Sequence, residues 1–206
     1  MINEQNHPNR TTFSDRLAHT VRIVSIPPLM VAAILTVLRF CRPALFPDLS
    51  SFWFSQLFLA LLPLLAYPLS YAVPFVRKKG RDGQRSLAMY LSFFGYLSAV
   101  LYGCLKGCAE GLRVIHLTYL LSVLLLLVLN KLLRIRASGH ACSVSGPILL
   151  LFLYVGIVGV VTGIILWTLI FWASLRTKRH TRREYLLGSG IPIVAYVLSA
   201  LIYMLL

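Results

Sequence analysis

Long apolar runs make up most of this 206-residue chain, and they limit its possible folds more than any other feature. A helix needs about 20 mostly apolar residues to cross a bilayer. Hydrocarbon offers no partner to a backbone N–H or C=O group, so such runs must form helices that pair these groups internally. The runs lie at 23–40, 52–76, 87–105, 114–129, 148–173 and 185–206, without the alternation typical of outer-membrane strands. The sequence therefore predicts an all-α fold, a polytopic transmembrane helix bundle.

The composition supports a membrane protein and argues against a nucleic-acid partner. Apolar residues account for 58% of the chain and charged residues for 13%, far from the balance of a soluble globular domain. The net charge is +14, but the Lys and Arg residues lie between the apolar runs, where they usually record membrane topology. The four cysteines match no spacing typical of a disulfide framework or a metal site. We expect no nucleic acid, no metal and no other cofactor.

The number of membrane crossings depends on the run 148–173, which is too long for one comfortable crossing. Gly156, Gly159 and Gly163 interrupt it. We expect two helices with a turn near Gly159 to Gly163, and a single tilted helix is the alternative. The first reading gives seven helices in one transmembrane domain, residues 21–206, after a polar N-terminal tail, residues 1–20. The helices are expected at about 23–40, 52–76, 87–105, 114–131, 140–158, 161–175 and 184–206.

Lysine and arginine residues divide unequally between the two sides of a seven-helix bundle. Sixteen fall on one side, and four, Arg39, Arg42, Lys106 and Arg113, fall on the other. By the positive-inside rule, the richer side faces the cytosol. We therefore expect an integral protein of the plasma (inner) membrane with a cytosolic N-terminus and an external C-terminus.

Two polar segments contain residues of catalytic type beside the apolar runs. Residues 131–145 read KLLRIRASGHACSVS, and residues 174–188 read SLRTKRHTRREYLLG. Each segment contains one histidine, His140 or His180. In a seven-helix bundle both segments lie on the same face of the membrane, so we expect the two imidazoles to share one site.

The residues around these histidines resemble motifs of the type 2 phosphatidic-acid phosphatase superfamily, membrane histidine phosphatases that share a helical core with vanadium haloperoxidases. Residues 136–140, Arg-Ala-Ser-Gly-His, are similar to the family's Pro-Ser-Gly-His motif. Residues 180–184, His-Thr-Arg-Arg-Glu, are similar to its His-x-x-x-Asp motif. The resemblance covers the order of spans from Val114 to the C-terminus, half of the chain. It implies a phosphatase-type core in the C-terminal part.

The resemblance implies a role for each polar residue of the two segments. His180 is the expected nucleophile, which would form a phosphohistidine that water then hydrolyses. Glu184, one helical turn later, would accept a hydrogen bond from the other ring nitrogen of His180 and fix its tautomer. His140 would protonate the leaving group as a general acid. The expected donors to the phosphate oxygens are Lys131, Arg136, Ser138, Gly139, Arg176 and Arg179.

The chain departs from the family's pattern at four places. The usual Lys followed six residues later by Arg-Pro is absent, so Lys131 corresponds only loosely. Ser174 stands where an Arg is expected six residues before the nucleophilic histidine, which leaves the neighbouring arginines to replace it. Ala137 replaces the usual Pro, and Glu184 replaces the usual Asp. These departures leave open whether the chain is an enzyme.

The resemblance implies a membrane lipid phosphatase that hydrolyses a phosphate monoester or diphosphate of a lipid. Phosphatidate, phosphatidylglycerol phosphate and a polyprenyl diphosphate are the expected substrate classes, and the residues favour none of the three. The expected partners are the lipid phosphate substrate and the surrounding membrane lipids. A non-catalytic lipid-binding or assembly subunit on the same fold is the first alternative. A small transporter is the second, although the polar midplane residues that it would need are nearly absent.

Other polar or special residues have structural interpretations. His116, within an apolar run, is expected to be a hydrogen-bonded residue of the bundle. Asn130 is expected either to cap a helix or to support the site. The prolines of the first half are expected to bend helices. The loop 77–85, RKKGRDGQR, is expected to meet lipid headgroups and to guide an anionic substrate.

Overall fold

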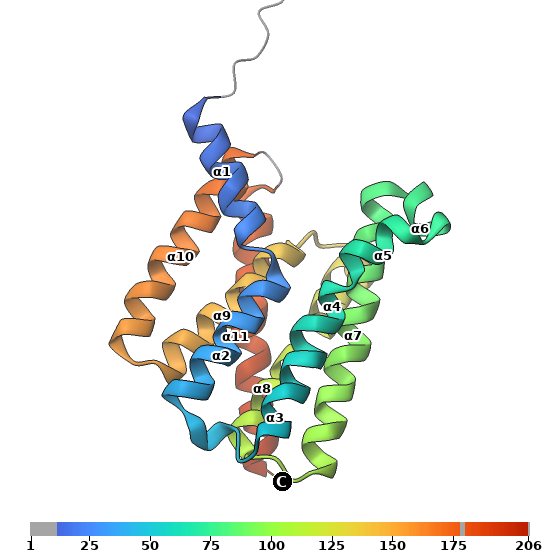
Figure 1. The fold of residues 1–206 in the computed structure, drawn as a ribbon. Coiled ribbons are helices and arrows are strands. Elements are labelled where there is room, and N and C mark those ends of the chain that lie inside the picture. The colour runs from blue at the N-terminus through green and yellow to red at the C-terminus, as the bar shows by residue number, and fades with distance from the viewer. Residues whose placement is uncertain (1–11, 178–179, 206) are drawn as a thin grey trace, which may run out of the picture.

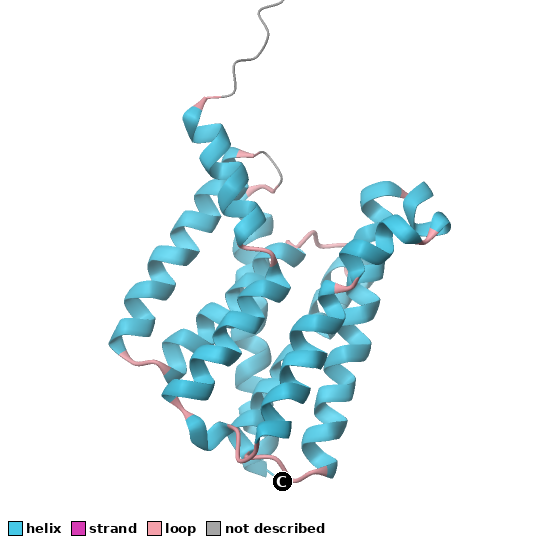
Figure 2. Cartoon of the chain, in the orientation of Figure 1, coloured by secondary structure: helices cyan, strands magenta, loops and turns pink. Residues whose placement is uncertain are grey.

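The computed structural model describes residues 12–177 and 180–205, and these residues form helices and connecting loops without a strand (Figures 1 and 2). The α-helices are α1 (Phe13–Val24), α2 (Pro27–Cys41), α3 (Leu49–Gln56), α4 (Leu62–Leu64), α5 (Ala66–Ala72), α6 (Pro74–Lys78), α7 (Gly80–Leu105), α8 (Glu110–Leu127), α9 (Gly139–Tyr154), α10 (Ile157–Arg176) and α11 (Arg182–Leu205). Three short helices accompany them: the 3-10 helix η1 (Pro43–Leu45) and the π-helices η2 (Leu57–Leu61) and η3 (Val128–Leu132). The predicted all-α fold is confirmed.

Several of the described helices are long and apolar enough to cross a membrane. There are 5 of these: Leu49–Ala72, Gly80–Leu105, Glu110–Leu132, Ile157–Arg176 and Arg182–Leu205. Helices α1 and α2 together are a sixth candidate, bent by 61° at their junction, and α9 is an apolar helix of only 16 residues. On the outer face of α10, Ile157 and Val158 are 76% and 68% exposed, which suits contact with lipid tails. The helices are compatible with an integral membrane protein of five or six spans.

The chain reverses direction between α9 and α10, which run side by side in Figure 1. One unbroken helix across 148–173 is therefore excluded. The turn lies at Val155 and Gly156, and Gly156 has a φ of 72°, a backbone conformation that glycine adopts without steric cost. The turn comes earlier in the chain than the predicted position near Gly159 to Gly163.

Gly159 and Gly163 lie inside α10 and face α9. A Cβ atom on Gly159 would collide with the carbonyl oxygen of Leu151, and one on Gly163 would collide with the ring of Phe152. Small residues at such positions let two membrane helices approach closely. These two glycines therefore allow the close contact between α9 and α10, and they do not form the turn.

Helix α1 begins inside the segment that the sequence predicted as a polar tail. The Asp15 N–H donates to Thr12 Oγ1 at 3.3 Å, and the Thr12 N–H donates to Asp15 Oδ2 at 3.1 Å, a reciprocal capping box. Pro27 and Pro28 occupy the first turn of α2, where a missing N–H removes no helical bond. Because of the bend before Pro27, α1 lies beside α10 at one end of the bundle (Figure 1).

Prolines accompany a distortion inside the span Leu49–Ala72 and the end of that span. The π-helix η2 precedes Pro63, and the backbone leaves helical geometry again at Val73, immediately before Pro74. Proline lacks the N–H that would continue the ladder, and it pushes the preceding residue toward extended backbone. The chain therefore turns away from the bundle into α6 before α7 begins.

One end of the bundle gathers most of the basic residues. Helix α1, the α5–α6–α7 connection, the loop 133–138, the end of α10 and the start of α11 all lie at the end opposite the C-terminus (Figure 1). We call this end the basic end. The described basic residues near the opposite end are Arg39, Arg42, Lys106 and Arg113.

Candidate functional site

The two histidine motifs lie against each other at the basic end. The Ser138 N–H donates to the carbonyl oxygen of Glu184 at 2.9 Å, which joins the loop before α9 to the first turn of α11. A Cβ atom on Gly188 would collide with the carbonyl oxygen of Ser138, so the two backbones are in direct contact here. His180 is close enough to His140 to act on it electrostatically.

Glu184 both contacts His180 and caps α11. Its Oε2 atom lies 3.5 Å from Nδ1 of His180. The same Oε2 accepts the Thr181 N–H at 3.2 Å, and Thr181 Oγ1 accepts the Glu184 N–H at 3.2 Å. This reciprocal pair is a capping box. The carboxylate is therefore fixed by the helix start while it faces the imidazole.

The surroundings of His180 favour its neutral form. Burial lowers the pKa of His180 from its ordinary value of 6.5. The hydrogen bond and the negative charge of Glu184 raise the pKa again in part, whereas the positive charges of Arg85 and Arg22 lower it further. A neutral imidazole keeps a lone pair on one ring nitrogen, which is the form that acts as a nucleophile.

Ser138 is the N-cap of α9. Its side-chain oxygen accepts the Ala141 N–H at 3.2 Å, and α9 begins at Gly139. The N–H groups of Gly139 and His140 belong to the first helical turn, where they have no partner within the helix. Such groups attract anions, as does the positive end of the helix dipole. The start of α9 can therefore donate to phosphate oxygens from the backbone.

Asn130, in η3, holds the loop in front of Ser138. Its Oδ1 atom accepts the Ala137 N–H at 2.9 Å, and its Nδ2 atom donates to the Ala137 carbonyl oxygen at 3.2 Å. Both backbone groups of Ala137 are thus paired with one side chain. Two roles were expected for Asn130, a helix cap or a support for the site, and this geometry favours the second.

His140 lines a pocket of about 250 Å³ at the basic end. The Nε2 atom of His140 is buried and has no hydrogen-bond partner among the residues that the structure describes. Buried polar atoms without a partner are uncommon in folded proteins. The other residues lining the pocket are His19, Arg22, Ile23, Ile26, Pro27 and Tyr67.

Two of the long basic side chains predicted to bind phosphate have no described contact with the histidines. Lys131 and Arg136 are exposed, and within residues 12–177 and 180–205 no hydrogen bond or ion pair joins them to His140 or His180. Arg179 lies outside the described residues. The part of these side chains in phosphate binding therefore stays a prediction.

Arg176 has a different partner from the one predicted. Its Nε atom donates to Asp15 Oδ1 at 2.9 Å, and its Nη2 atom lies 3.5 Å from Thr12 Oγ1. Arg176 thus ties the end of α10 to the start of α1. Ser174 is buried, and its hydroxyl has no partner in the described part of the chain. It does not replace the arginine that the family has at this position.

Two other arginines lie closer to the histidines than the motifs indicated. Arg22 of α1 lines the pocket and acts electrostatically on both His140 and His180. Arg85 of α7 lies within electrostatic range of Arg22 and His180. Arg22 was missed because it precedes the first motif by more than half of the chain, and Arg85 was expected to meet headgroups and to guide an anionic substrate, not to act on the histidines.

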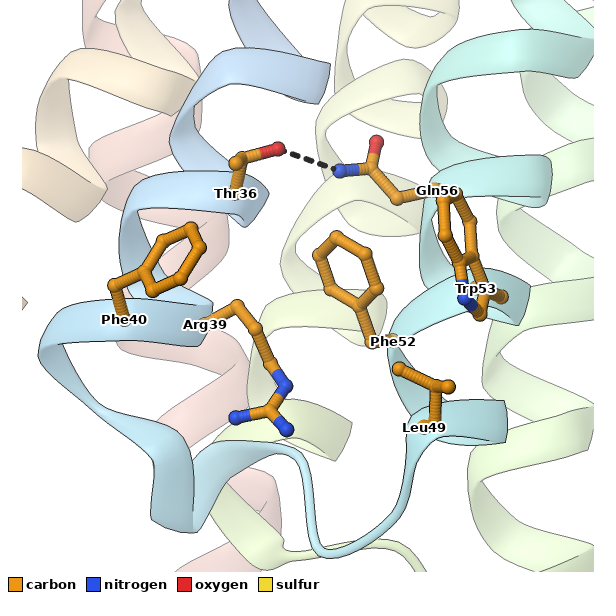
Figure 3. A pocket seen from close by; sticks show the side chains of 7 residues that line it. All are labelled: Thr36, Arg39, Phe40, Leu49, Phe52, Trp53 and Gln56. Carbon is orange, nitrogen blue, oxygen red and sulfur yellow. Dashed lines mark hydrogen bonds between the residues drawn. The ribbon is translucent and has the colours of Figure 1, made fainter.

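A second pocket of about 480 Å³ lies between α2 and α3 toward the opposite end of the bundle (Figure 3). Two of its lining residues are joined by a hydrogen bond, which Gln56 Nε2 donates to Thr36 Oγ1 at 3.1 Å. The lining is largely apolar, and its only charged member is Arg39. Since the lining includes neither a histidine nor a carboxylate, we place the candidate site at the smaller pocket.

His116 is a hydrogen-bonded residue of the bundle, as expected. It is fully buried, and its Nε2 atom lies 2.9 Å from Oγ of Ser55. This pair joins α8 to α3 and is separate from the basic end. Its role is therefore structural.

Comparison of the chain with known protein families, with curated proteins and with solved structures gives no match. Among the described residues, no group of three or more His, Cys, Asp or Glu side chains could hold a metal ion. The candidate site is thus defined by its own geometry: two histidines, one carboxylate and a helix N-terminus at the basic end.

Proposed function

We propose that this protein is a membrane phosphatase that hydrolyses a phosphate monoester or diphosphate of a lipid through a phosphohistidine on His180. We further propose a core like that of the type 2 phosphatidic-acid phosphatase superfamily. The observation that carries the proposal is the junction between the motifs, where the Ser138 N–H donates to the Glu184 carbonyl at 2.9 Å. Glu184 in turn lies 3.5 Å from His180. This junction supports one shared site for His180, Glu184 and His140.

The first step of the proposed reaction transfers the phosphoryl group to the protein. Nε2 of neutral His180 attacks phosphorus, and the bond between phosphorus and the lipid oxygen breaks. His140, which takes up a proton when the phosphate anion is bound beside it, gives that proton to the oxygen as it leaves. Glu184 stabilises the positive charge that develops on the His180 ring, and the N–H groups at the start of α9 donate to the phosphate oxygens.

The second step restores the protein. Water attacks the phosphohistidine while His140, now neutral, accepts a proton from that water. The bond between phosphorus and Nε2 of His180 breaks, and inorganic phosphate leaves. Both histidines then have the protonation states with which the cycle began.

Phosphate release from purified protein tests this proposal directly. In detergent micelles the protein is expected to release inorganic phosphate from at least one of phosphatidate, phosphatidylglycerol phosphate and a polyprenyl diphosphate. The released phosphate is measured by a colorimetric assay, with phosphatidylcholine as the substrate that should not react. Absence of release from all three lipids would contradict catalysis.

The ionisation of His180 gives a prediction that does not depend on turnover. Since burial lowers its pKa, His180 should titrate below pH 6.5. Glu184→Gln removes the charge that raises this pKa, so the midpoint should move to still lower pH under the remaining influence of burial, Arg85 and Arg22. A glutamine can keep the capping bond to the Thr181 N–H.

The measurement is an NMR titration of isotope-labelled histidine in detergent, with the His180 signal assigned by its loss in His180→Asn. The Glu184→Gln variant should show unchanged helix content. A midpoint above 6.5 in the unmodified protein, or an upward shift in Glu184→Gln, would contradict the proposed surroundings of His180.

We also propose seven crossings, with α9 as the short seventh span and the basic end in the cytosol. Support comes from the antiparallel arrangement of α9 and α10 and from the gathering of basic residues at one end (Figure 1). A reporter protein that fluoresces only in the cytosol should then fluoresce when it is inserted at Gly80. Alkaline phosphatase, which is active only outside the cytosol, should be inactive at the same position. An active alkaline phosphatase at Gly80 would reverse the orientation.

A non-catalytic lipid-binding protein on the same fold is a second candidate. The ion pair between Arg176 and Asp15 and the buried Ser174 favour it, because Ser174 lacks the guanidinium that the family uses on phosphate and Arg176, a predicted replacement, is paired with a carboxylate. This candidate predicts binding of phosphorylated lipids without any release of phosphate.

A further inference from the structure

Positive charge converges at the pocket beside His140, and none of the described residues that line this pocket is a carboxylate. Arg22 is half-buried and lines the pocket together with His140, and it lies within electrostatic range of Arg81, Arg85 and both histidines of the site. In the described part of the chain, no ion pair involves Arg22, and Arg85 has only an exposed, 3.8 Å contact with Asp82. Like charges in a partly buried space repel strongly unless an anion compensates them. The pocket is therefore electrostatically prepared for an anion.

Helix α1 is fixed in the position that presents Arg22 to this pocket. Near its start, Asp15 accepts the Arg176 Nε–H at 2.9 Å, and Ala18 is completely buried one turn before Arg22. The end of α10 thus binds α1 through Arg176, and α1 brings its own arginine to the histidines.

The pocket has a polar part and an apolar part, as an amphiphile requires. Arg22, His19, Tyr67 and His140 provide groups that bind an anion or donate hydrogen bonds. Ile23, Ile26 and Pro27 line the remainder, at the junction where α1 and α2 meet at 61°. Pro27 is the first residue of α2, which belongs to the candidate membrane span.

We propose that Arg22 forms the phosphate clamp of the site, and that the pocket at the α1–α2 bend binds the phosphate head of a lipid with its hydrocarbon along Ile23, Ile26 and Pro27. The expected effect on turnover rests on the proposed function, whereas the expected effect on lipid binding does not. A guanidinium can bind two phosphate oxygens at once. The buried, unpaired Nε2 atom of His140 would gain a partner when the phosphate is bound.

Binding and turnover measured together test this clamp. The variants are Arg22→Gln and Arg85→Gln, with Arg22→Lys to separate charge from bidentate geometry and Arg39→Gln as a matched control at the other pocket. The probes are short-chain phosphatidate, phosphatidylcholine with the same chains, and inorganic phosphate. Their dissociation constants are measured by calorimetry in detergent, and KM and kcat are measured for phosphate release from phosphatidate.

We expect Arg22→Gln to weaken phosphatidate binding and to raise KM by about 10- to 100-fold, the range typical of a lost charged hydrogen bond. Arg85→Gln should have a smaller effect in the same direction, Arg22→Lys an intermediate effect, and Arg39→Gln none. Circular dichroism and thermal unfolding check that each variant is folded.

The outcomes separate this inference from the proposed function. If folded Arg22→Gln binds phosphatidate as tightly as the unmodified protein, the clamp is overturned even when phosphate release continues. If the unmodified protein binds phosphatidate in an Arg22-dependent way but releases no phosphate, the clamp stands and the enzymatic proposal fails. If inorganic phosphate binds as tightly as phosphatidate, the lipid part of the inference is overturned.

Discussion

Replacement of His180 by alanine should lower kcat for phosphate release by about 1,000-fold or more, because the protein loses the atom that attacks phosphorus. The fold should survive this change. His180 precedes α11, and its described polar contact is with Glu184, which remains fixed by the capping box with Thr181. The expected result is thus a folded, inactive protein, measured by phosphate release and by thermal unfolding.

A trapping experiment shows whether His180 carries the phosphoryl group. Rapid quenching of the unmodified protein with phosphatidate should give an acid-labile, base-stable phosphoryl group, located at residue 180 by mass spectrometry. His140→Ala should slow both formation and hydrolysis of this intermediate, while His180→Ala should show none. Full activity in His180→Ala would contradict the phosphohistidine mechanism but not the helical-bundle fold.

Gly188→Ala should have the largest structural effect of any single methyl group added near the site. The new Cβ atom would collide with the backbone carbonyl of Ser138, and a backbone atom cannot swing aside as a flexible side chain can. The two motifs would have to separate, which breaks the hydrogen bond from Ser138 to Glu184. We expect a loss of about 1 to 3 kcal/mol in unfolding free energy and a loss of most phosphate release.

Gly190→Ala is the matched control on the same helix. A Cβ atom there meets nothing within 4 Å, and alanine is a better helix former than glycine by about 1 kcal/mol. This variant should be at least as stable as the unmodified protein and fully active, as judged by thermal unfolding and phosphate release. Equal behaviour of the two variants would contradict the close contact between α11 and the Ser-Gly-His segment.

The helices were predictable from the sequence because a long apolar run in a bilayer finds no other hydrogen-bond partners and must pair its own backbone groups. The turn between α9 and α10 was harder to place. Gly156, Gly159 and Gly163 look alike in the sequence, whereas in the structure the first supplies a positive φ and the other two supply close helix contact. Backbone angle and neighbours across the bundle distinguish these roles, and neither is visible in a glycine's sequence position.

The candidate site was predictable only where its residues are neighbours in the chain. The segment around His140 and the segment around His180 each carry a local pattern, and the spacing between them allowed both to reach one end of the bundle. Arg22 carries no such pattern, since its position depends on the bend before α2 and on the distant pair between Asp15 and Arg176. Contacts between residues so far apart in the sequence depend on the packing of the folded chain, so no local sequence pattern predicts them.

The shortness of α9 determines how deep the proposed chemistry takes place. A helix of 16 residues is about 24 Å long, less than the hydrocarbon thickness of about 30 Å. Its first turn, with His140, would therefore lie below the level of the surrounding headgroups. A substrate lipid must then sink toward the imidazoles, or the surrounding bilayer must become thinner. Turnover should accordingly depend on the acyl chain length of the host membrane, even when the substrate itself stays the same.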